Sequence, residues 1–189
     1  MSDLPPGGVV WITGHPASGK STLAERVVEV LRGRGTVTLW LDSDDLRRTL
    51  TPDPTYSEEE RDRFYGSLGH FAVLGAEGGA VAVVSATAPR RRYRDDVRER
   101  VSRFAEVFLE CETEVLESRD PKGLYAGARR GEIERLPGLG APYEAPTDPE
   151  LRLDSGELEP EELAEAVLDW IEAAGLLDSR APEPPLRSG

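Results

Sequence analysis

The sequence predicts a three-layer α/β fold, in which helices flank a parallel central sheet on both faces. Two observations carry this prediction: short apolar runs alternate with helical stretches, and a glycine-rich segment follows the first run. Strands separated by helices form βαβ units, whose crossover helices cover both faces of a parallel sheet. A chain of 189 residues can bury one such core as a single domain.

The expected strands are short runs rich in β-branched and other apolar residues. They are Val9–Thr13, Val37–Leu41, Val81–Val84 and Glu106–Leu109. Helices are expected between the strands and near the end of the chain, at Thr22–Leu31, Glu58–Gly75, Arg91–Phe104 and Pro160–Ala173. Gly33 closes the first helix and Gly175 lies just past the last one, as glycine commonly does at helix ends.

The stretch Asp120–Pro149 is rich in glycine, proline and charged residues and is too long for a simple connection. Loops of this length are usually lids or binding loops. We therefore predict one domain over residues 1–178 with a lid at about 120–149. The Pro-rich residues 179–189 are expected to form a disordered tail.

The glycine-rich segment fits the P-loop pattern G-x-x-x-x-G-K-[ST], directly after a strand and directly before a helix. Its backbone N–H groups would surround the phosphates of ATP, Lys20 would reach the β- and γ-phosphates, and Ser21 would bind Mg²⁺. The fold is therefore expected to be a P-loop NTPase sandwich. The predicted nucleotide-binding residues are Gly14, His15, Pro16, Ala17, Ser18, Gly19, Lys20, Ser21 and Thr22.

P-loops also occur in regulatory GTPases and in motor ATPases. The chain contains no Asn, so the guanine-reading pattern N-K-x-D is impossible. The D-x-x-G match, Asp120 to Gly123, follows a charged stretch instead of an apolar strand, which makes it a poor GTPase switch. A small kinase or an ATPase remains.

Acidic side chains follow the second expected strand, in Leu41-Asp42-Ser43-Asp44-Asp45-Leu46-Arg47. Ligands of parallel sheets gather at the carboxyl ends of strands, where such carboxylates can hold Mg²⁺ or accept the proton of an attacking hydroxyl. Asp42 and Asp44 would lie on the same side if the chain stays extended. Arg47 suits a phosphate or sulfate of the acceptor. The alternative is a solvated turn in which an aspartate, Asp45 for example, only caps a helix.

The composition of the chain argues against several kinds of binding partner. The net charge of −13 argues against nonspecific binding to nucleic acid or to a membrane surface. No apolar run approaches the roughly 18 residues that span a bilayer, and the start Met-Ser-Asp-Leu-Pro-Pro lacks the features of a signal peptide. The single cysteine, Cys111, fits a reducing cytosol, so a cytoplasmic protein is expected. A homodimer is the common symmetric assembly.

Several segments resemble the adenylylsulfate (APS) kinase family. The strand Val10–Gly14 with its P-loop is similar to the family's first strand, Leu41 to Arg47 is similar to L-D-G-D-N-[LV]-R, and Tyr56 to Arg61 is similar to F-S-x-x-D-R. The most specific matches lie in and after the predicted lid, at 119–125, 128–129, 131–133, 142–146, 149–151 and 153–154. The resemblance covers residues 8–175.

This resemblance implies a kinase that uses ATP and Mg²⁺ to phosphorylate the 3′-hydroxyl of APS, giving PAPS. It implies that Asp44 is the base and that Asp42 supports it or the metal. Further roles follow by position: phosphosulfate binding by Arg47 and Arg61, purine stacking by Tyr56, a mobile lid at Arg119–Tyr125 with Arg119 at the nucleotide, and phosphate bridging by Lys122.

The chain departs from the family pattern on the acceptor side. Phe64, Gly66 and Ser67 replace an asparagine and two arginines, and Leu136 replaces a second stacking aromatic residue. The basic cluster Arg90–Arg94 could supply replacement cations or could be the solvated start of a helix. Three hypotheses remain: an APS kinase, a related kinase with another nucleotide or a specialised metabolite as acceptor, and an inactive nucleotide-binding module.

Overall fold

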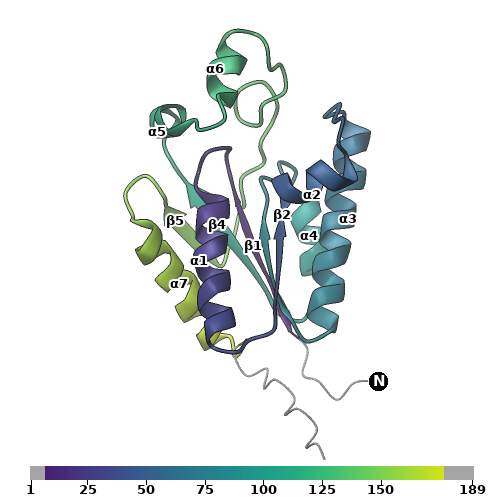
Figure 1. The fold of residues 1–189 in the computed structure, drawn as a ribbon, viewed down its shortest axis with the longest axis vertical. Coiled ribbons are helices and arrows are strands. Elements are labelled where there is room, and N and C mark those ends of the chain that lie inside the picture. The colour runs from purple at the N-terminus through teal and green to yellow at the C-terminus, as the bar shows by residue number, and fades with distance from the viewer. Residues whose placement is uncertain (1–6, 177–189) are drawn as a thin grey trace, which may run out of the picture.

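The computed structural model describes residues 7–176, and its centre is one sheet of parallel strands (Figure 1). In spatial order the strands run β2-β3-β1-β4-β5. Their bounds are β1 Gly8–Gly14, β2 Thr38–Asp42, β3 Val81–Ser85, β4 Phe104–Glu110 and β5 Leu151–Asp154. The four expected strands are confirmed to within two residues at each end, and the edge strand β5 was not predicted.

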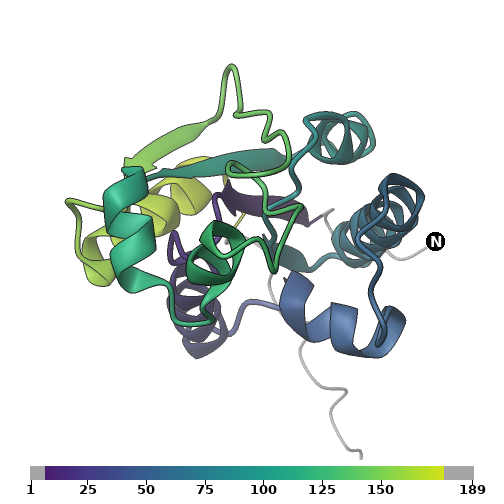
Figure 2. The same cartoon turned by 90° about the horizontal axis from the view of Figure 1, so that it is seen from above.

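Helices cover both faces of this sheet, so the predicted three-layer architecture is confirmed (Figures 1 and 2). Strand β1 shows the division most clearly, because successive side chains of a strand point to opposite faces. Val10 and Ile12 join the core beneath α1 and α7, whereas Val9 and Trp11 join the core beneath α3 and α4. The helices are α1 Lys20–Gly33, α2 Ser43–Leu50, α3 Glu58–Glu77, α4 Arg92–Arg98, α5 Thr113–Arg119, α6 Leu124–Arg129 and α7 Pro160–Ala173.

One expected helix boundary is wrong. The helix expected over Arg91–Phe104 stops at Arg98, because Phe104 pairs with Val9 and is the first residue of β4. The first helix ends at Gly33, as expected, and Gly35 just beyond it adopts the left-handed conformation (φ 79°) that glycine tolerates at a helix end.

The segment predicted to be a lid, residues 120–149, stands above the carboxyl edge of the sheet and is called the lid below (Figure 1). It contains α6 and a long loop that returns to β5, and α5 leads into it. A small apolar cluster of its own, Leu116, Tyr125 and Leu136, holds these segments together and packs against Ala17 of the P-loop. No helix within residues 7–176 is long and apolar enough to cross a membrane. The predicted tail at 179–189 lies outside the described residues.

Candidate active site

The P-loop joins β1 to α1 at the carboxyl edge of the sheet. Gly14 is required there, because a Cβ atom at this position would lie 2.6 Å from the carbonyl oxygen of Leu109. Gly19 caps α1 in the left-handed conformation, which directs the free N–H groups of the first helical turn toward the loop. Within residues 7–176 the buried hydroxyl of Ser18 has no hydrogen-bond partner. This backbone is therefore built to receive an anion.

Lys20 is half-buried at the first position of α1, and its Nζ donates a hydrogen bond of 2.7 Å to the carbonyl oxygen of His15. Burial lowers the pKa of Lys20 to about 8, although the nearby carboxylate of Asp44 acts in the opposite direction. Desolvation disfavours an uncompensated ammonium group. A phosphate placed in the loop would supply the missing negative charge.

Asp42 closes β2 and links three elements. Its Oδ2 accepts hydrogen bonds from Ser21 Oγ (2.6 Å) and from Ser85 Oγ (2.7 Å), the latter across the pairing of Asp42 with Ser85 in neighbouring strands. Its Oδ1 accepts from the backbone N–H groups of Asp44 (2.9 Å) and Asp45 (3.1 Å), so Asp42 caps α2. Burial tends to raise the pKa of Asp42, but these hydrogen bonds together hold it below its usual value.

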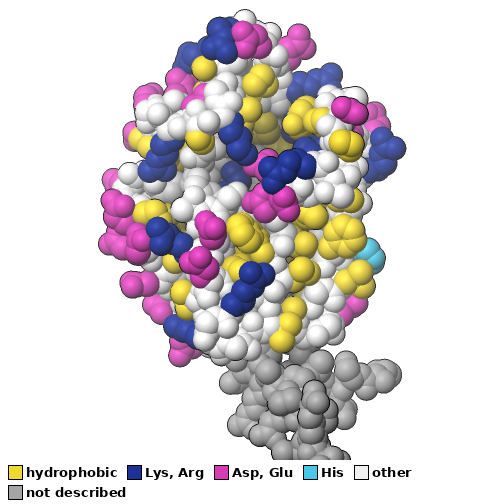
Figure 3. All heavy atoms as spheres, in the orientation of Figure 1, with side chains coloured by type: hydrophobic (Ala, Val, Ile, Leu, Met, Phe, Trp, Pro, Cys, Tyr) yellow, Lys and Arg dark blue, Asp and Glu magenta, His cyan; other side chains and the backbone are white. Residues whose placement is uncertain are grey.

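The expected extended geometry after Asp42 is wrong, because α2 begins at Ser43. The helix cap is Asp42 and not Asp45, whose carboxylate pairs with Arg48 at 2.6 Å. Asp44 in the first turn of α2 forms an ion pair with Lys122 of the lid. The structure thus brings Asp44 and both lysines of the chain to the edge of the sheet where the P-loop lies. In Figure 3, acidic and basic side chains meet beside a hollow where the lid joins the body.

Arg47, the cation predicted to bind the acceptor, is already paired. It forms an ion pair of 2.8 Å with Glu60, and its guanidinium carbon lies 3.9 Å from the centre of the Phe64 ring. Glu60 also accepts hydrogen bonds from the backbone and hydroxyl of Thr55 and from the backbone of Tyr56. Burial tends to raise the pKa of Glu60, but the hydrogen bonds of Thr55 and the charge of Arg47 hold it low.

Arg61 and Tyr56 lie beside this pair. Arg61 donates to the carbonyl oxygens of Tyr56 (3.1 Å) and Arg135 (2.9 Å), the second of which belongs to the lid. Tyr56 is 45% exposed and has a left-handed backbone (φ 52°), which is rare for a side chain other than Gly, Asn or Asp. Its ring also contacts the guanidinium groups of Arg47 and Arg61. Tyr56 is therefore accessible to a planar ligand.

The remaining predicted residues have structural partners. Leu136 is buried within the lid cluster, next to Tyr125. Arg119 donates a hydrogen bond of 2.7 Å to the carbonyl oxygen of Ser155, at the end of β5. Gly66 lies where the surfaces of α3 and α4 meet and leaves space there, since a Cβ atom would contact nothing within 4 Å. Within residues 7–176, none of these side chains forms a hydrogen bond with the P-loop.

Sequence reasoning missed the contacts between the lid and the P-loop. The ring of His15, predicted only as part of the nucleotide-binding loop, packs on that of Tyr143 with centroids 4.4 Å apart. The Tyr143 hydroxyl shares a hydrogen bond of 3.1 Å with Thr13, and the Tyr125 hydroxyl donates to the carbonyl oxygen of Pro16 at 3.1 Å. Burial lowers the pKa of His15. The signal for Ser85 was available, since it directly follows the third expected strand, at the same edge as Asp42.

Comparisons with known proteins agree with this geometry. A family model described as adenylylsulphate kinase matches residues 6–154. A probable adenylyl-sulfate kinase of Pyrococcus abyssi is 39% identical over 171 residues, covering 90% of this chain and 98% of the relative. A probable bifunctional SAT/APS kinase of Sorangium cellulosum is 40% identical over 92% of this chain, which covers only 30% of that protein. An APS kinase of Mycobacterium tuberculosis, solved in complex with AMPPNP and APS, superposes with a TM-score of 0.83 at 38% identity and covers 89% of this chain and 99% of that one.

Proposed function

The chain belongs to the adenylylsulphate kinase family, and from this membership we propose that it transfers the γ-phosphate of ATP to the 3′-hydroxyl of adenylyl sulfate. The products are PAPS and ADP. One observation carries the proposal: the P-loop residue Ser21 and the acidic residue Asp42 are in direct contact at the carboxyl edge of the sheet, and Asp44 follows in the first turn of α2. This arrangement supports a phosphate site beside a candidate base.

On the donor side, the chain's own groups bind and orient the phosphates of ATP. The N-terminus of α1 favours an anion in the loop, as does the Ser18 hydroxyl, which has no hydrogen-bond partner within residues 7–176. Lys20 would exchange its contact with the His15 carbonyl for the β- and γ-phosphates and stabilise charge on the transferring group.

The residues also fit Mg²⁺. Magnesium in kinases is usually held by one or two protein oxygen ligands together with substrate phosphates and water. The hydroxyl of Ser21 and the carboxylate of Asp42, 2.6 Å apart, form such a donor pair. A bound Mg²⁺ ion would neutralise charge on the β- and γ-phosphates. Groups of three or more acidic, His or Cys ligands are absent from residues 7–176, in keeping with a metal that needs the nucleotide to complete its ligands.

On the acceptor side, Asp44 would take the proton of the 3′-hydroxyl. The oxygen then forms its bond to the γ-phosphorus as the bond from phosphorus to the bridging oxygen of ADP breaks. In the structure the Asp44 carboxylate is occupied by Lys122. When Lys122 moves to the phosphates of the two nucleotides, Asp44 is released to act as base. Closure of the lid would also exclude water, a competing acceptor.

The test is a coupled assay of ADP release with and without APS. We expect ADP release that depends on APS, with PAPS detected as the product. Release that requires a different hydroxyl compound would support the second hypothesis, a related kinase with another acceptor. Binding of ATP without turnover on any acceptor would support an inactive nucleotide-binding module. The expected homodimer stays a prediction, which light scattering of the purified protein would check.

A further inference from the structure

The basic cluster at the start of α4 has partners in the last part of the lid. Glu144 accepts hydrogen bonds from Arg90 Nη1 (3.1 Å) and from the backbone N–H of Arg91 (2.8 Å). Its own backbone N–H donates to the carbonyl oxygen of Pro89 at 2.8 Å. Glu144 is thus bound on both its side chain and its backbone to the segment that precedes α4.

Arg94, in the first turn of α4, also binds the end of the lid. It is fully buried, and its guanidinium group donates to the carboxylate of Glu106 in β4 and to the carbonyl oxygens of Ala88 and Glu144, the last at 2.7 Å. A buried guanidinium group is stable only if its charge and its donors are satisfied. Arg94 therefore joins the sheet, the segment before α4 and the end of the lid in one network. Neither role expected for this part of the cluster, replacement cation or solvated helix start, agrees with this burial.

The neighbouring residue Tyr143 faces the P-loop. Its hydroxyl contacts Thr13, and its ring lies on His15 and near Phe108. Gly138 in the same loop lies so close to His15 that a Cβ atom there would be 2.4 Å from its Nδ1 atom. Consecutive residues of the lid thus contact the phosphate site and the α4 network. A displacement of Glu144 would move Tyr143.

We propose that Glu144, held by Arg90 and Arg94, is a positioning residue that anchors the end of the lid and sets its place over the P-loop. The attachment itself does not depend on which reaction is catalysed, whereas its effect on turnover rests on the proposed function. Hydrogen bonding to Arg91, opposed by burial and aided by Arg90, holds the pKa of Glu144 below its usual value, so the carboxylate is charged at neutral pH.

A rival role for Arg90 is direct contact with the acceptor. Arg90 also pairs with Glu58 at 2.9 Å, in the first turn of α3, which places it near the acceptor-side residues. The two roles predict different kinetics. Loss of a contact that anchors the lid changes kcat and KM together. Loss of a contact with the acceptor raises the KM of the acceptor alone.

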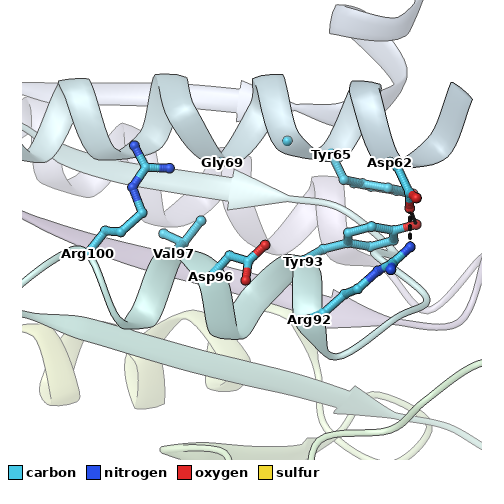
Figure 4. A pocket seen from close by; sticks show the side chains of 9 residues that line it. Asp62, Tyr65, Gly69, Arg92, Tyr93, Asp96, Val97 and Arg100 are labelled. Carbon is cyan, nitrogen blue, oxygen red and sulfur yellow. Dashed lines mark hydrogen bonds and ion pairs between the residues drawn. The ribbon is translucent and has the colours of Figure 1, made fainter. Parts of the chain in front are cut away.

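The chain provides a matched control in the same cluster. Arg92 belongs to α4, but it pairs with Asp62 of α3 and lies beside Tyr93, and no contact of its side chain with the lid is found among residues 7–176 (Figure 4). Arg92→Ala removes the same charge without touching the attachment. Because Arg90 and Glu144 are each about one third exposed, 36% and 33%, their alanine variants should fold.

The experiment compares Glu144→Ala, Arg90→Ala, the double variant and Arg92→Ala. The first readout is limited trypsin digestion of the protein without substrate, with mass spectrometry of cuts after the lid residues Arg129, Arg130 and Arg135. We expect cleavage to be about fivefold faster in Glu144→Ala, unchanged in Arg92→Ala, and no faster in the double variant than in Glu144→Ala, as coupled partners require. Thermal melting identifies any variant that is unfolded.

The second readout is steady-state kinetics with ATP and APS. We expect Glu144→Ala to lower kcat and to raise both KM values, with a combined loss of about tenfold in kcat/KM. Unchanged lid cleavage in Glu144→Ala would overturn the proposal, as would an Arg90→Ala variant in which only the KM of the acceptor rises. If the wild-type protein shows no turnover, the proposed function fails while the digestion still tests the anchor.

Discussion

The two halves of the candidate site are built in different ways. The donor half, the P-loop and Asp42, is held by backbone geometry and hydrogen bonds, and it contains groups that await a ligand, such as the buried hydroxyl of Ser18. The acceptor half, the part of α2 and α3 around Arg47, is held by side chains that already satisfy one another. There the guanidinium group of Arg47 forms an ion pair with Glu60 and lies over the Phe64 ring.

This difference shows how much freedom each half has to change. A P-loop must direct several backbone N–H groups at one point, so few of its residues can vary without loss of the site. Pairing among side chains can be rearranged one residue at a time, provided that buried charges stay compensated. Under the proposed function, the donor half would therefore fix the chemistry, and the acceptor half would be where the affinity for the acceptor is adjusted.

The largest effect should come from the donor half. Lys20→Ala should lower kcat by about 10³-fold with any acceptor, because a preorganised positive charge at the transferring phosphoryl group is lost. The control is Arg32→Ala, which removes an exposed cation at the other end of α1. The coupled ADP assay measures both variants. If Lys20→Ala retained more than a few per cent of the wild-type kcat, the donor half would not be the part of the site that determines the chemistry.

The second effect lies at the boundary between the halves. Asp44→Asn should lower kcat by about 10²-fold, because the variant loses the proton acceptor. The affinity for ATP should stay within a few-fold, because no contact with the phosphates is removed. Asp45→Asn is the matched control in the same helical turn, because within residues 7–176 the ion-pair partner of its carboxylate is the exposed Arg48. If Asp42→Asn lowers kcat more than Asp44→Asn does, the roles of the two aspartates are reversed.

The donor half was also the part that the sequence predicted best. The P-loop pattern is local, so its strand, its turn and its helix could be placed from eight consecutive residues, 14–21. The contact of Asp42 with Ser21 agrees with the expected metal-binding pair. The end of α4 was harder to predict, because the helix expected to reach Phe104 stops at Arg98 and only the pairing of the strands shows that Phe104 belongs to β4.

The acceptor half depends on contacts between distant residues, which a single sequence does not reveal. From the sequence, Phe64 was described only as replacing the family's asparagine. Its contact with the guanidinium group of Arg47 becomes visible only when α2 and α3 are packed together. The same holds for the lid, where Tyr143 meets Thr13 across 130 residues. Local patterns predict elements, but they do not give the pairing of ionic side chains between elements.

The acceptor half gives the third prediction. Phe64→Asn should lower the KM for APS by about tenfold, because it adds a hydrogen-bond donor and frees Arg47, and one charge-assisted contact contributes about 1.5–3 kcal/mol. Phe64→Leu is the control, since it removes the ring without adding a donor, and its KM should stay within about threefold. Burial of an amide will lower the melting temperature of Phe64→Asn, so kinetics are measured well below it. Equal KM changes in the two variants would mean that packing, and not the donor, controls acceptor affinity.

The smallest expected effect tests whether the donor half is completed by a metal. ATP with Mg²⁺ should raise the melting temperature by about 2–4 °C more than ATP with EDTA, as a fivefold tighter complex would. Asp42→Asn should abolish this extra shift, because the amide keeps the cap of α2 but removes the charge beside Ser21. Asp45→Asn should retain it. Equal shifts with and without Mg²⁺ in the wild-type protein would show that Ser21 and Asp42 hold no metal, and the donor half would then bind the phosphates through Lys20 and the backbone alone.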